Sequence, residues 1–274
     1  MSRGGYRASL QSSGLPGAGR IAFAVLLRVL LEVLRDPQRG LAALPVLPDI
    51  LLLSLLGLLV GLTIHETAHA LVAHWLGDPT ARLAGRISLN PLRHLDPFGT
   101  MMLLVVGIGW GKPVPINPFK LRLGPLRGPA VVALAGPLAN IGLAGVLALP
   151  IRLGVLKWHS PAFYPLPFAQ DDPAYLAADV LGYFIFFNIM LAAFNVVPIA
   201  PLDGARLLGF LLPRRALPLL QRYEVIGPLL LGPVVLLLLA VDLVSGSTRL
   251  ANLIAPLANL LALVIIGRPL LPPP

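Results

Sequence analysis

The sequence contains no cysteine. A disulfide, an iron–sulfur cluster, a thiol nucleophile and a thiolate zinc site are therefore excluded. Any metal ion bound by side chains must be held by histidine, aspartate or glutamate. The chain offers few of these, with five histidines and 12 acidic residues among 274.

Charge is also scarce, since only 12% of residues are charged and 57% are apolar, with a mean hydropathy of +0.84. A soluble domain carries about 25% charged residues, so these figures exclude an ordinary soluble or disordered chain and indicate a membrane protein. The net charge is +9. Because the basic residues separate apolar stretches instead of gathering on one solvated face with aromatics, we expect no nucleic-acid partner.

Long apolar stretches predict the membrane helices, because about 20 apolar residues are needed to cross the hydrocarbon core. A shorter stretch at Ile21–Leu34 carries Arg28, Glu32 and Arg35 at helical spacing, so it is either an interfacial amphipathic helix or a short first span. The five longer stretches are Ile50–Leu76, Pro129–Leu149, Tyr175–Val197, Val225–Val244 and Leu250–Gly267.

The connections between these stretches differ in their content of lysine and arginine. Residues 77–128 are rich in both and residues 203–223 are rich in arginine, whereas residues 152–174 hold only Arg152 and Lys157 beside two aspartates. Basic connections prefer the cytoplasmic side. We therefore expect the first two connections to be cytoplasmic and the third external, and the basic N-terminus favours six spans over five.

Residues 101–110 are apolar but too short to cross a membrane, and a proline-rich run from Gly111 to Pro118 follows them. A re-entrant loop or an edge strand fits this pattern, and a surface linker is the alternative. The expected fold is an all-α polytopic membrane protein of about five to six transmembrane helices, with a re-entrant loop or short β segment. We expect three regions: an N-terminal segment at 1–48, a membrane core at 49–213 that carries the motifs described below, and C-terminal helices at 214–274.

The first strong span contains His65-Glu66-x-x-His69. Residues four apart lie on one helical face, so both imidazoles can hold one Zn²⁺. Glu66 lies about 100° further round the helix, where its carboxylate can take a proton from water without being a ligand. The alternative is a polar cluster that only joins helices.

A zinc site needs a third ligand. His74 faces away from His69 on the helix, and His94 and His159 fall in loops, where solvated surface side chains are the better interpretation. Asp242 has the position of an ordinary interfacial carboxylate. Asp203 follows two prolines that must interrupt a helix, so its carboxylate either projects into the bundle as a ligand or only caps the next helix.

One further polar residue, Asn140, lies inside the apolar stretch that contains Gly136 and Pro137. Its amide either donates a hydrogen bond to a reacting carbonyl or joins neighbouring helices. Small residues such as Gly136 allow helices to approach closely in a membrane.

Three motifs in this order resemble the site-2 protease family of intramembrane zinc metalloproteases, and the stretch from Gly109 to Pro115 is similar to the re-entrant loop of that family. The combination spans roughly residues 57–209 and is far more specific than one motif alone. The motifs are His65-Glu66-x-x-His69, Gly136-Pro137-x-x-Asn140 and Asn195-x-x-Pro198-x-x-Pro201-Leu202-Asp203-Gly204.

The resemblance implies one Zn²⁺ per chain held by His65, His69 and Asp203, with Glu66 as the base and Asn140 assisting. It also implies a multi-pass protein of the cell membrane with its active site toward the cytoplasm, and a transmembrane protein substrate such as an anti-sigma-factor-like or signal-peptide-like helix. Many relatives carry a PDZ or CBS domain, but neither fits this sequence, so regulation by such a domain in the same chain is not expected, and a separate regulatory protein is a candidate partner. The alternative function is a zinc transporter or metal sensor that uses the same ligands, and a catalytically dead relative that only binds membrane proteins is a further one.

Overall fold

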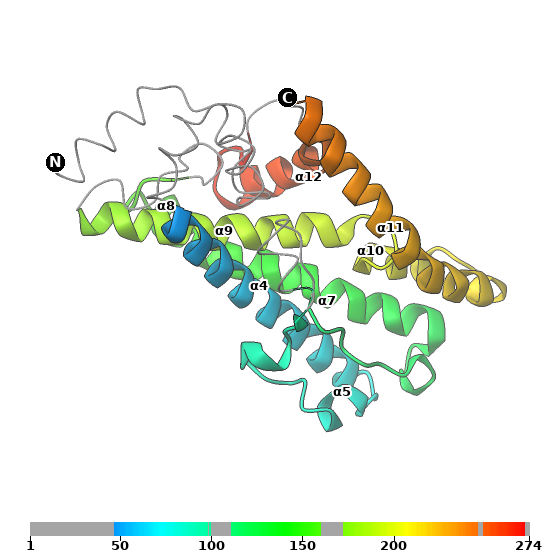
Figure 1. Ribbon diagram of the computed structural model, residues 1–274. Coiled ribbons are helices and arrows are strands. Elements are labelled where there is room, and N and C mark those ends of the chain that lie inside the picture. The colour runs from blue at the N-terminus through cyan, green and yellow to red at the C-terminus, as the bar shows by residue number, and fades with distance from the viewer. Residues whose placement is uncertain (1–46, 98, 100–110, 160–171, 246–248, 272–274) are drawn as a thin grey trace.

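The computed structural model describes residues 47–97, 99, 111–159, 172–245 and 249–271 (Figure 1). These residues form helices and turns and contain no β-strand. The α-helices are α4 (Leu47–Trp75), α5 (Thr80–Leu83), α7 (Gly124–Leu147), α8 (Leu149–Arg152), α9 (Pro173–Val196), α10 (Asp203–Leu207), α11 (Leu217–Ser245) and α12 (Arg249–Ile265). Short 3₁₀ turns lie at Pro91–Arg93, Pro118–Lys120, Leu208–Phe210 and Arg214–Ala216.

Three long helices, α4, α7 and α9, pack against one another and form the centre of the molecule (Figure 1). Each of them contains a helical stretch of 24 or 25 residues that is long and apolar enough to cross a membrane. They correspond to the first three of the five long predicted spans. The fold is therefore a helical membrane protein, as the composition indicated.

The last two predicted spans also lie in helices, which are α11 with 29 residues and α12 with 17. The apolar part of α12, Asn252–Ile265, is shorter than the hydrocarbon core requires for an upright helix. The prediction of five to six spans therefore stays a prediction. The stretch Ile21–Leu34 lies outside the described residues.

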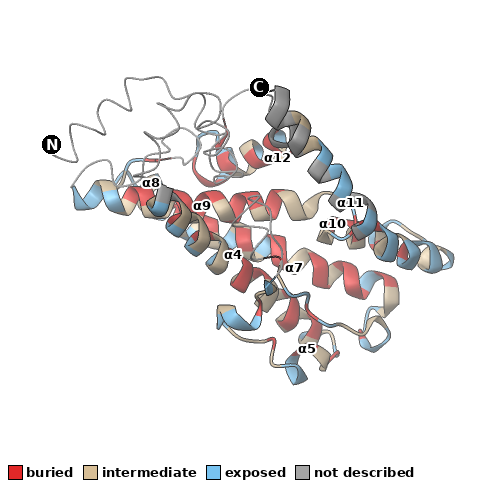
Figure 2. Ribbon diagram, viewed as in Figure 1, coloured by how far each residue is buried: buried red, intermediate tan, exposed pale blue. Residues whose placement is uncertain are grey.

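Small side chains allow the helices to approach closely. Ala144 of α7, Ala193 of α9, and Ala258 and Ala262 of α12 are completely buried in one apolar cluster, together with the larger Phe186 (Figure 2). Because lipid tails are as apolar as these side chains, the helices gain no hydrophobic free energy by associating, and close van der Waals packing is one of the forces that hold them together. This cluster joins α12 to the central helices.

The ends of α9 follow from local sequence. The side chain of Asp172 accepts a hydrogen bond from the backbone N–H of Ala174 at 2.9 Å, and Pro173 occupies the first helical position. The helix ends at Val196, two residues before Pro198, with Val197 as its C-cap. The predicted interruption by prolines is confirmed, and it creates the turn that leads to α10.

The segment after residue 110 was predicted to be a re-entrant loop or an edge strand. The described part contains a single isolated antiparallel bridge, between Leu95 and Gly111, and residues 100–110 of the proposed loop lie outside the described residues. Val114 is buried against Ala70 of α4, whereas Lys112 is exposed. One side of this segment therefore packs on the end of α4 that carries the paired histidines.

Asp78 joins the segment after α4 to the segment before α7. Its buried carboxylate accepts hydrogen bonds from the backbone N–H and hydroxyl of Thr80, at 3.0 and 2.5 Å, and from the backbone N–H of Asn117 at 2.5 Å. Burial alone would raise the pKa of Asp78, but these hydrogen bonds and the charge of Lys120 hold its pKa below the ordinary value. The ionised carboxylate therefore stabilises this end of the bundle.

Candidate metal centre

Three predicted site residues, His65, His69 and Asp203, converge in the described structure. The Nε2 atoms of both histidines lie 3.0 Å from the same oxygen, Oδ2 of Asp203. The two imidazole rings are nearly perpendicular, at 89°, with their centroids 4.5 Å apart. Ligand atoms of all three residues lie within 4.8 Å of one another, close enough to share one metal ion.

The second nitrogen of each imidazole is held by a hydrogen-bond acceptor. Nδ1 of His69 donates to the carbonyl of Val132 at 2.7 Å, and Nδ1 of His65 donates to Oδ1 of Asn140 at 2.6 Å. The Asn140 amide is oriented by its Nδ2, which donates to the carbonyl of Gly61 at 3.0 Å. In a neutral imidazole with a protonated Nδ1, Nε2 carries a lone pair. Both lone pairs therefore face the shared space.

This arrangement fits a metal cation. Two lone pairs and a carboxylate oxygen meet without a hydrogen atom between them, and Oδ2 of Asp203 is buried with no hydrogen-bond partner among the described residues. Burying a carboxylate oxygen beside two lone pairs costs free energy unless a cation binds between them. Two imidazoles and one carboxylate are a common donor set for catalytic zinc, which keeps a fourth position open. Nδ1 contacts of the kind made by both histidines orient metal ligands.

Asp203 reaches the histidines because a tight turn joins α9 to α10. Asp203 is the first residue of α10, and Leu202 is the N-cap of this helix. The Asp203 side chain therefore contacts the histidines instead of capping the helix. A Cβ atom at Gly204 would collide with the carbonyl oxygens of Val196 and Val197. Glycine at this position therefore allows α10 to start directly against the end of α9.

Helix α11 holds the same turn from the other side. The hydroxyl of Tyr223 donates to the carbonyl of Pro198 at 3.0 Å and accepts a hydrogen bond from the backbone N–H of Ala200 at 3.1 Å. A Cβ atom at Gly227 would lie 2.7 Å from the oxygen of Ala200, so α11 and the turn are in direct contact. The position of Asp203 thus depends on residues of α11.

Gly136 of α7 forms a wall of the site. A Cβ atom here would lie 2.5 Å from Cε1 of His65 and 2.5 Å from Nε2 of His69, closer than real Cβ contacts allow. The backbone of α7 can therefore approach the imidazoles only because this residue is glycine.

The remaining predicted site residues, Glu66 and Asn140, occupy different positions. Glu66 follows His65 on α4, is half-buried, and has no hydrogen bond or ion pair in the described structure. Asn140 is completely buried behind His65, and its Nδ2 donates to Oδ1 of Asn188 at 2.8 Å as well as to Gly61. Both amide protons of Asn140 are therefore already donated within the protein.

The other histidines lie outside the cluster, but two expectations about them were wrong. His94 and His159 were expected on a solvated surface, and they are buried, with exposed fractions of 0% and 7%. The ring of His94 contacts the carbonyl of Ser88 at 2.7 Å beneath α4, and His159 is paired with Asp179 at 2.9 Å. His74 contacts Arg82 and faces away from the cluster as expected. The side chain of Asp242 is outside those described.

Two residues of this region were not predicted from the sequence. Asn188 is an amide in the middle of an apolar span, so the criterion that selected Asn140 would also have selected it. Tyr223 gave no comparable signal, because its contact with the turn at residues 198–200 depends on how α11 packs.

A helical membrane bundle with two histidines and one aspartate around a shared space defines a membrane protein with the donor set of hydrolytic metal enzymes. The chain is 38% identical over 157 residues to a Bacillus subtilis protein named "Putative zinc metalloprotease YwhC", and the match covers 57% of this chain and 67% of the relative. The chain therefore belongs to the zinc metalloprotease family that includes this protein.

More distant relatives carry a similar name. The chain is 30% identical over 159 residues to "Putative zinc metalloprotease Rip2" of Mycolicibacterium smegmatis, and the match covers 57% of this chain and 55% of the relative. It is 30% identical over 151 residues to the Rip2 protein of Mycobacterium tuberculosis, and the match covers 54% of this chain and 52% of the relative. The chain thus spans about half the length of these mycobacterial relatives. No family model and no solved structure matches the chain.

Proposed function

We propose that this protein is an intramembrane zinc metalloprotease of the site-2 protease type, which hydrolyses peptide bonds within or near transmembrane segments of membrane proteins. The main support is the convergence of His65, His69 and Asp203 inside a bundle of helices long enough to cross a membrane. The kinship with zinc metalloproteases gives independent support. In this proposal the catalytic core comprises residues 49–213, between the N-terminal segment at 1–48 and the C-terminal helices at 214–274.

His65, His69 and Asp203 would hold the zinc ion. When bound, zinc supplies Lewis acidity, which polarises a substrate carbonyl and makes water acidic enough to attack near neutral pH. Glu66 is the proposed base, because its carboxylate is free of hydrogen bonds and ion pairs and follows a ligand directly on α4. It would accept a proton from the attacking water and return it to the leaving amine as the peptide bond breaks.

Asn140 is proposed as a positioning residue. Its two amide protons are donated to Gly61 and Asn188, so it has none left for a reacting carbonyl. Its Oδ1 instead accepts the Nδ1–H of His65, which fixes the tautomer that presents Nε2 to the metal. This role differs from direct assistance to the substrate.

A transmembrane substrate would have to unwind before cleavage, because a helix hides its carbonyl groups in hydrogen bonds. The extended segment 111–117 packs against α4 and exposes Lys112, so it is a candidate for pairing with an unwound substrate strand. The basic connections predict that this end of the bundle faces the cytoplasm of a cell-membrane protein. An anti-sigma-factor-like or signal-peptide-like helix would suit such a site, with a separate protein as regulator.

The decisive experiment compares the wild type with Glu66→Gln in detergent, using a library of single-span helices and mass spectrometry to detect new peptide ends. Zinc is quantified in both proteins. We expect Glu66→Gln to retain zinc and to lose cleavage by at least about a hundredfold, because general base catalysis contributes about that much. Equal cleavage by the zinc-loaded variant would contradict the mechanism.

A zinc transporter with the same ligands is the rival function. Transport needs ligands and a path but no general base, so Glu66→Gln in proteoliposomes would still move zinc. Zinc uptake by both proteins, with no helix cut by the wild type, would favour transport over hydrolysis.

A further inference from the structure

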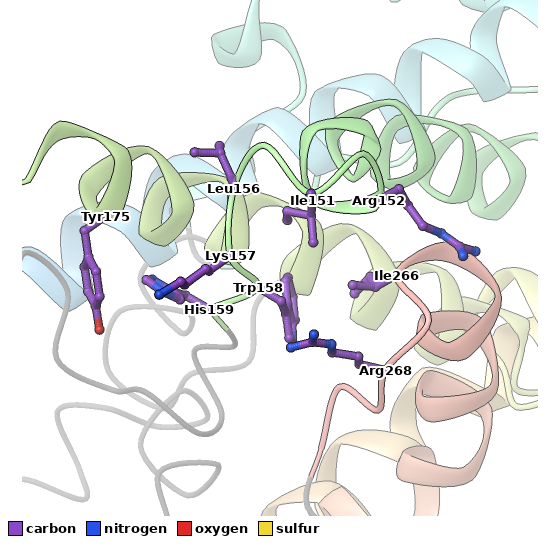
Figure 3. A pocket seen from close by; sticks show the side chains of 10 residues that line it. Ile151, Arg152, Leu156, Lys157, Trp158, His159, Tyr175, Ile266 and Arg268 are labelled. Carbon is purple, nitrogen blue, oxygen red and sulfur yellow. The ribbon is translucent and has the colours of Figure 1, made fainter.

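A cavity lies at the other end of the long helices from the candidate metal centre. It has a volume of about 660 Å³, which is in the range of small-molecule sites. Leu147, the last residue of α7, lies about 16 Å along the helix axis from Gly136, so the cavity beyond it is separate from the metal ligands. Its lining includes Arg152, Lys157, Trp158, His159, Tyr175 and Arg268 (Figure 3).

The charged side chains that line this cavity are cationic. Arg152, Lys157 and Arg268 carry positive charges, and none of the described lining residues is acidic. Arg152 uses its Nε to donate to the carbonyl of Ile265 at 2.9 Å, which fixes the guanidinium at the end of α12. Lys157 and Arg268 have no hydrogen-bond or ion-pair partner among the described residues. The cavity therefore concentrates positive charge that the described part of the protein does not neutralise.

His159 and its partner Asp179 leave the positive charge of the cavity unneutralised. Its Nδ1 lies 2.9 Å from Oδ1 of Asp179, which is 4% exposed and does not line the cavity. The Asp179 carboxylate is thus engaged by His159 and is not part of the cavity lining.

Trp158 provides a separate observation. Its side chain lines the cavity and is only 8% exposed, and its indole N–H has no hydrogen-bond partner among the described residues. An indole nitrogen can only donate, and leaving a buried donor unpaired is costly. In Figure 3 the Arg268 side chain extends toward Trp158. An anion with oxygen acceptors would satisfy the indole N–H and neutralise these cations together.

We propose that this cavity binds a phosphate group, carried by an anionic lipid headgroup or by a free phosphate. The forked donors of arginine match phosphate oxygens, and the ammonium of Lys157 and the indole N–H of Trp158 are further donors for them. Next to lining residues in the sequence lie exposed large apolar side chains, Leu153 and Val155 beside Gly154 and Val264 two residues before Ile266, with exposed fractions of 76%, 72% and 67%. These side chains would contact the acyl chains of a lipid.

The test uses the purified full chain in a neutral detergent, and native mass spectrometry measures the binding of phosphatidylglycerol and phosphatidylcholine. Inorganic phosphate is added alone in a parallel thermal-shift series. The variants are Arg268→Gln, which removes one exposed cation, and Trp158→Phe, which keeps an aromatic ring and removes the N–H. Arg215→Gln removes an exposed cation in a different segment and is the matched control. Equal zinc content in all variants verifies folding.

We expect one tightly retained phosphatidylglycerol per chain, with about tenfold weaker binding in Arg268→Gln and Trp158→Phe and no change in Arg215→Gln. Retention of phosphatidylglycerol but not phosphatidylcholine identifies a lipid headgroup as the source. Stabilisation of the wild type by inorganic phosphate, lost in Arg268→Gln, identifies free phosphate. The proposal is wrong if neither probe binds, or if both variants bind as the wild type does. Should Trp158→Phe not fold, Arg268→Gln decides, because its side chain is exposed.

Discussion

His65 and Asn140 form a hydrogen bond of 2.6 Å in which the imidazole Nδ1–H donates to the amide oxygen. Because this contact fixes which ring nitrogen faces the metal, Asn140→Leu should weaken zinc binding about 10- to 100-fold. Competition with a calibrated chelator measures this affinity. The thermal midpoint of the zinc-free protein, measured in parallel, reports any purely structural effect.

Asn188→Leu is the matched control for Asn140. It removes an acceptor for the amide Nδ2 but leaves the bond between Asn140 and His65 in place. We expect a much smaller loss of zinc affinity than for Asn140→Leu. Similar losses in both variants would indicate that the two amides act only by joining helices.

Gly136→Ala should disrupt the metal centre. The added methyl group would lie 2.5 Å from both imidazole rings, so the histidines or α7 must move. We expect zinc content and cleavage to fall at least about tenfold, since metal ligands tolerate little displacement. Gly142→Ala is the control on the same helix, because nothing lies within 4 Å of its added methyl group. Alanine in a helix interior is favoured over glycine by about 0.5–1 kcal/mol, so this variant should keep zinc and be at least as stable.

Tyr223→Phe tests the support that α11 gives to the turn before Asp203. The substitution removes hydrogen bonds to Pro198 and Ala200, each worth about 0.5–1.5 kcal/mol. We expect zinc to dissociate several times faster, which stopped-flow transfer to a chelator would measure. Glu224→Gln is the neighbouring comparison, since it weakens a partly exposed ion pair with Arg206 of α10 and leaves both hydrogen bonds of Tyr223 in place. Unchanged dissociation in Tyr223→Phe would mean that the turn holds Asp203 without these two hydrogen bonds.

Asp78 should make stability depend on pH. Its pKa in the folded protein is below the ordinary value, so its contribution is fully present above the unfolded-state pKa of about 3.9 and is lost as pH falls through the folded pKa. Thermal unfolding between pH 3 and 7 should therefore show a decline at the acidic end. In Asp78→Asn this decline should flatten. The variant should also be less stable near neutral pH, because one amide oxygen replaces a carboxylate that accepts from three donors.

The sequence predicted the cluster of His65, His69 and Asp203 better than the surroundings of this cluster. His65 and His69 are four apart on a helix, so their proximity follows from helical geometry alone. Asp203 depended on a family resemblance, because nothing local shows that a turn brings it back to α4. The acceptors behind the imidazoles, Val132 and Asn140, belong to α7, and only the packing of helices determines which carbonyl faces which ring.

Loop positions were the least predictable. His94 and His159 lie in stretches without periodicity, which carry no signal of burial, so both were expected on a solvated surface. The ends of helices also differed from the ends of the predicted spans. Hydropathy placed one span at Val225–Val244, but α11 begins at Leu217, because polar residues such as Arg222 and Glu224 are compatible with a helix outside the hydrocarbon core.

The contact between α11 and the turn before Asp203 bears on how the enzyme is made. The two histidines are synthesised early, whereas the carboxylate and the helix that holds its turn come from the later part of the chain. A nascent chain that stops before α11 has the paired imidazoles but not the supported aspartate. The cluster of His65, His69 and Asp203 is therefore completed late in synthesis, so unfinished chains would lack the proposed metal centre.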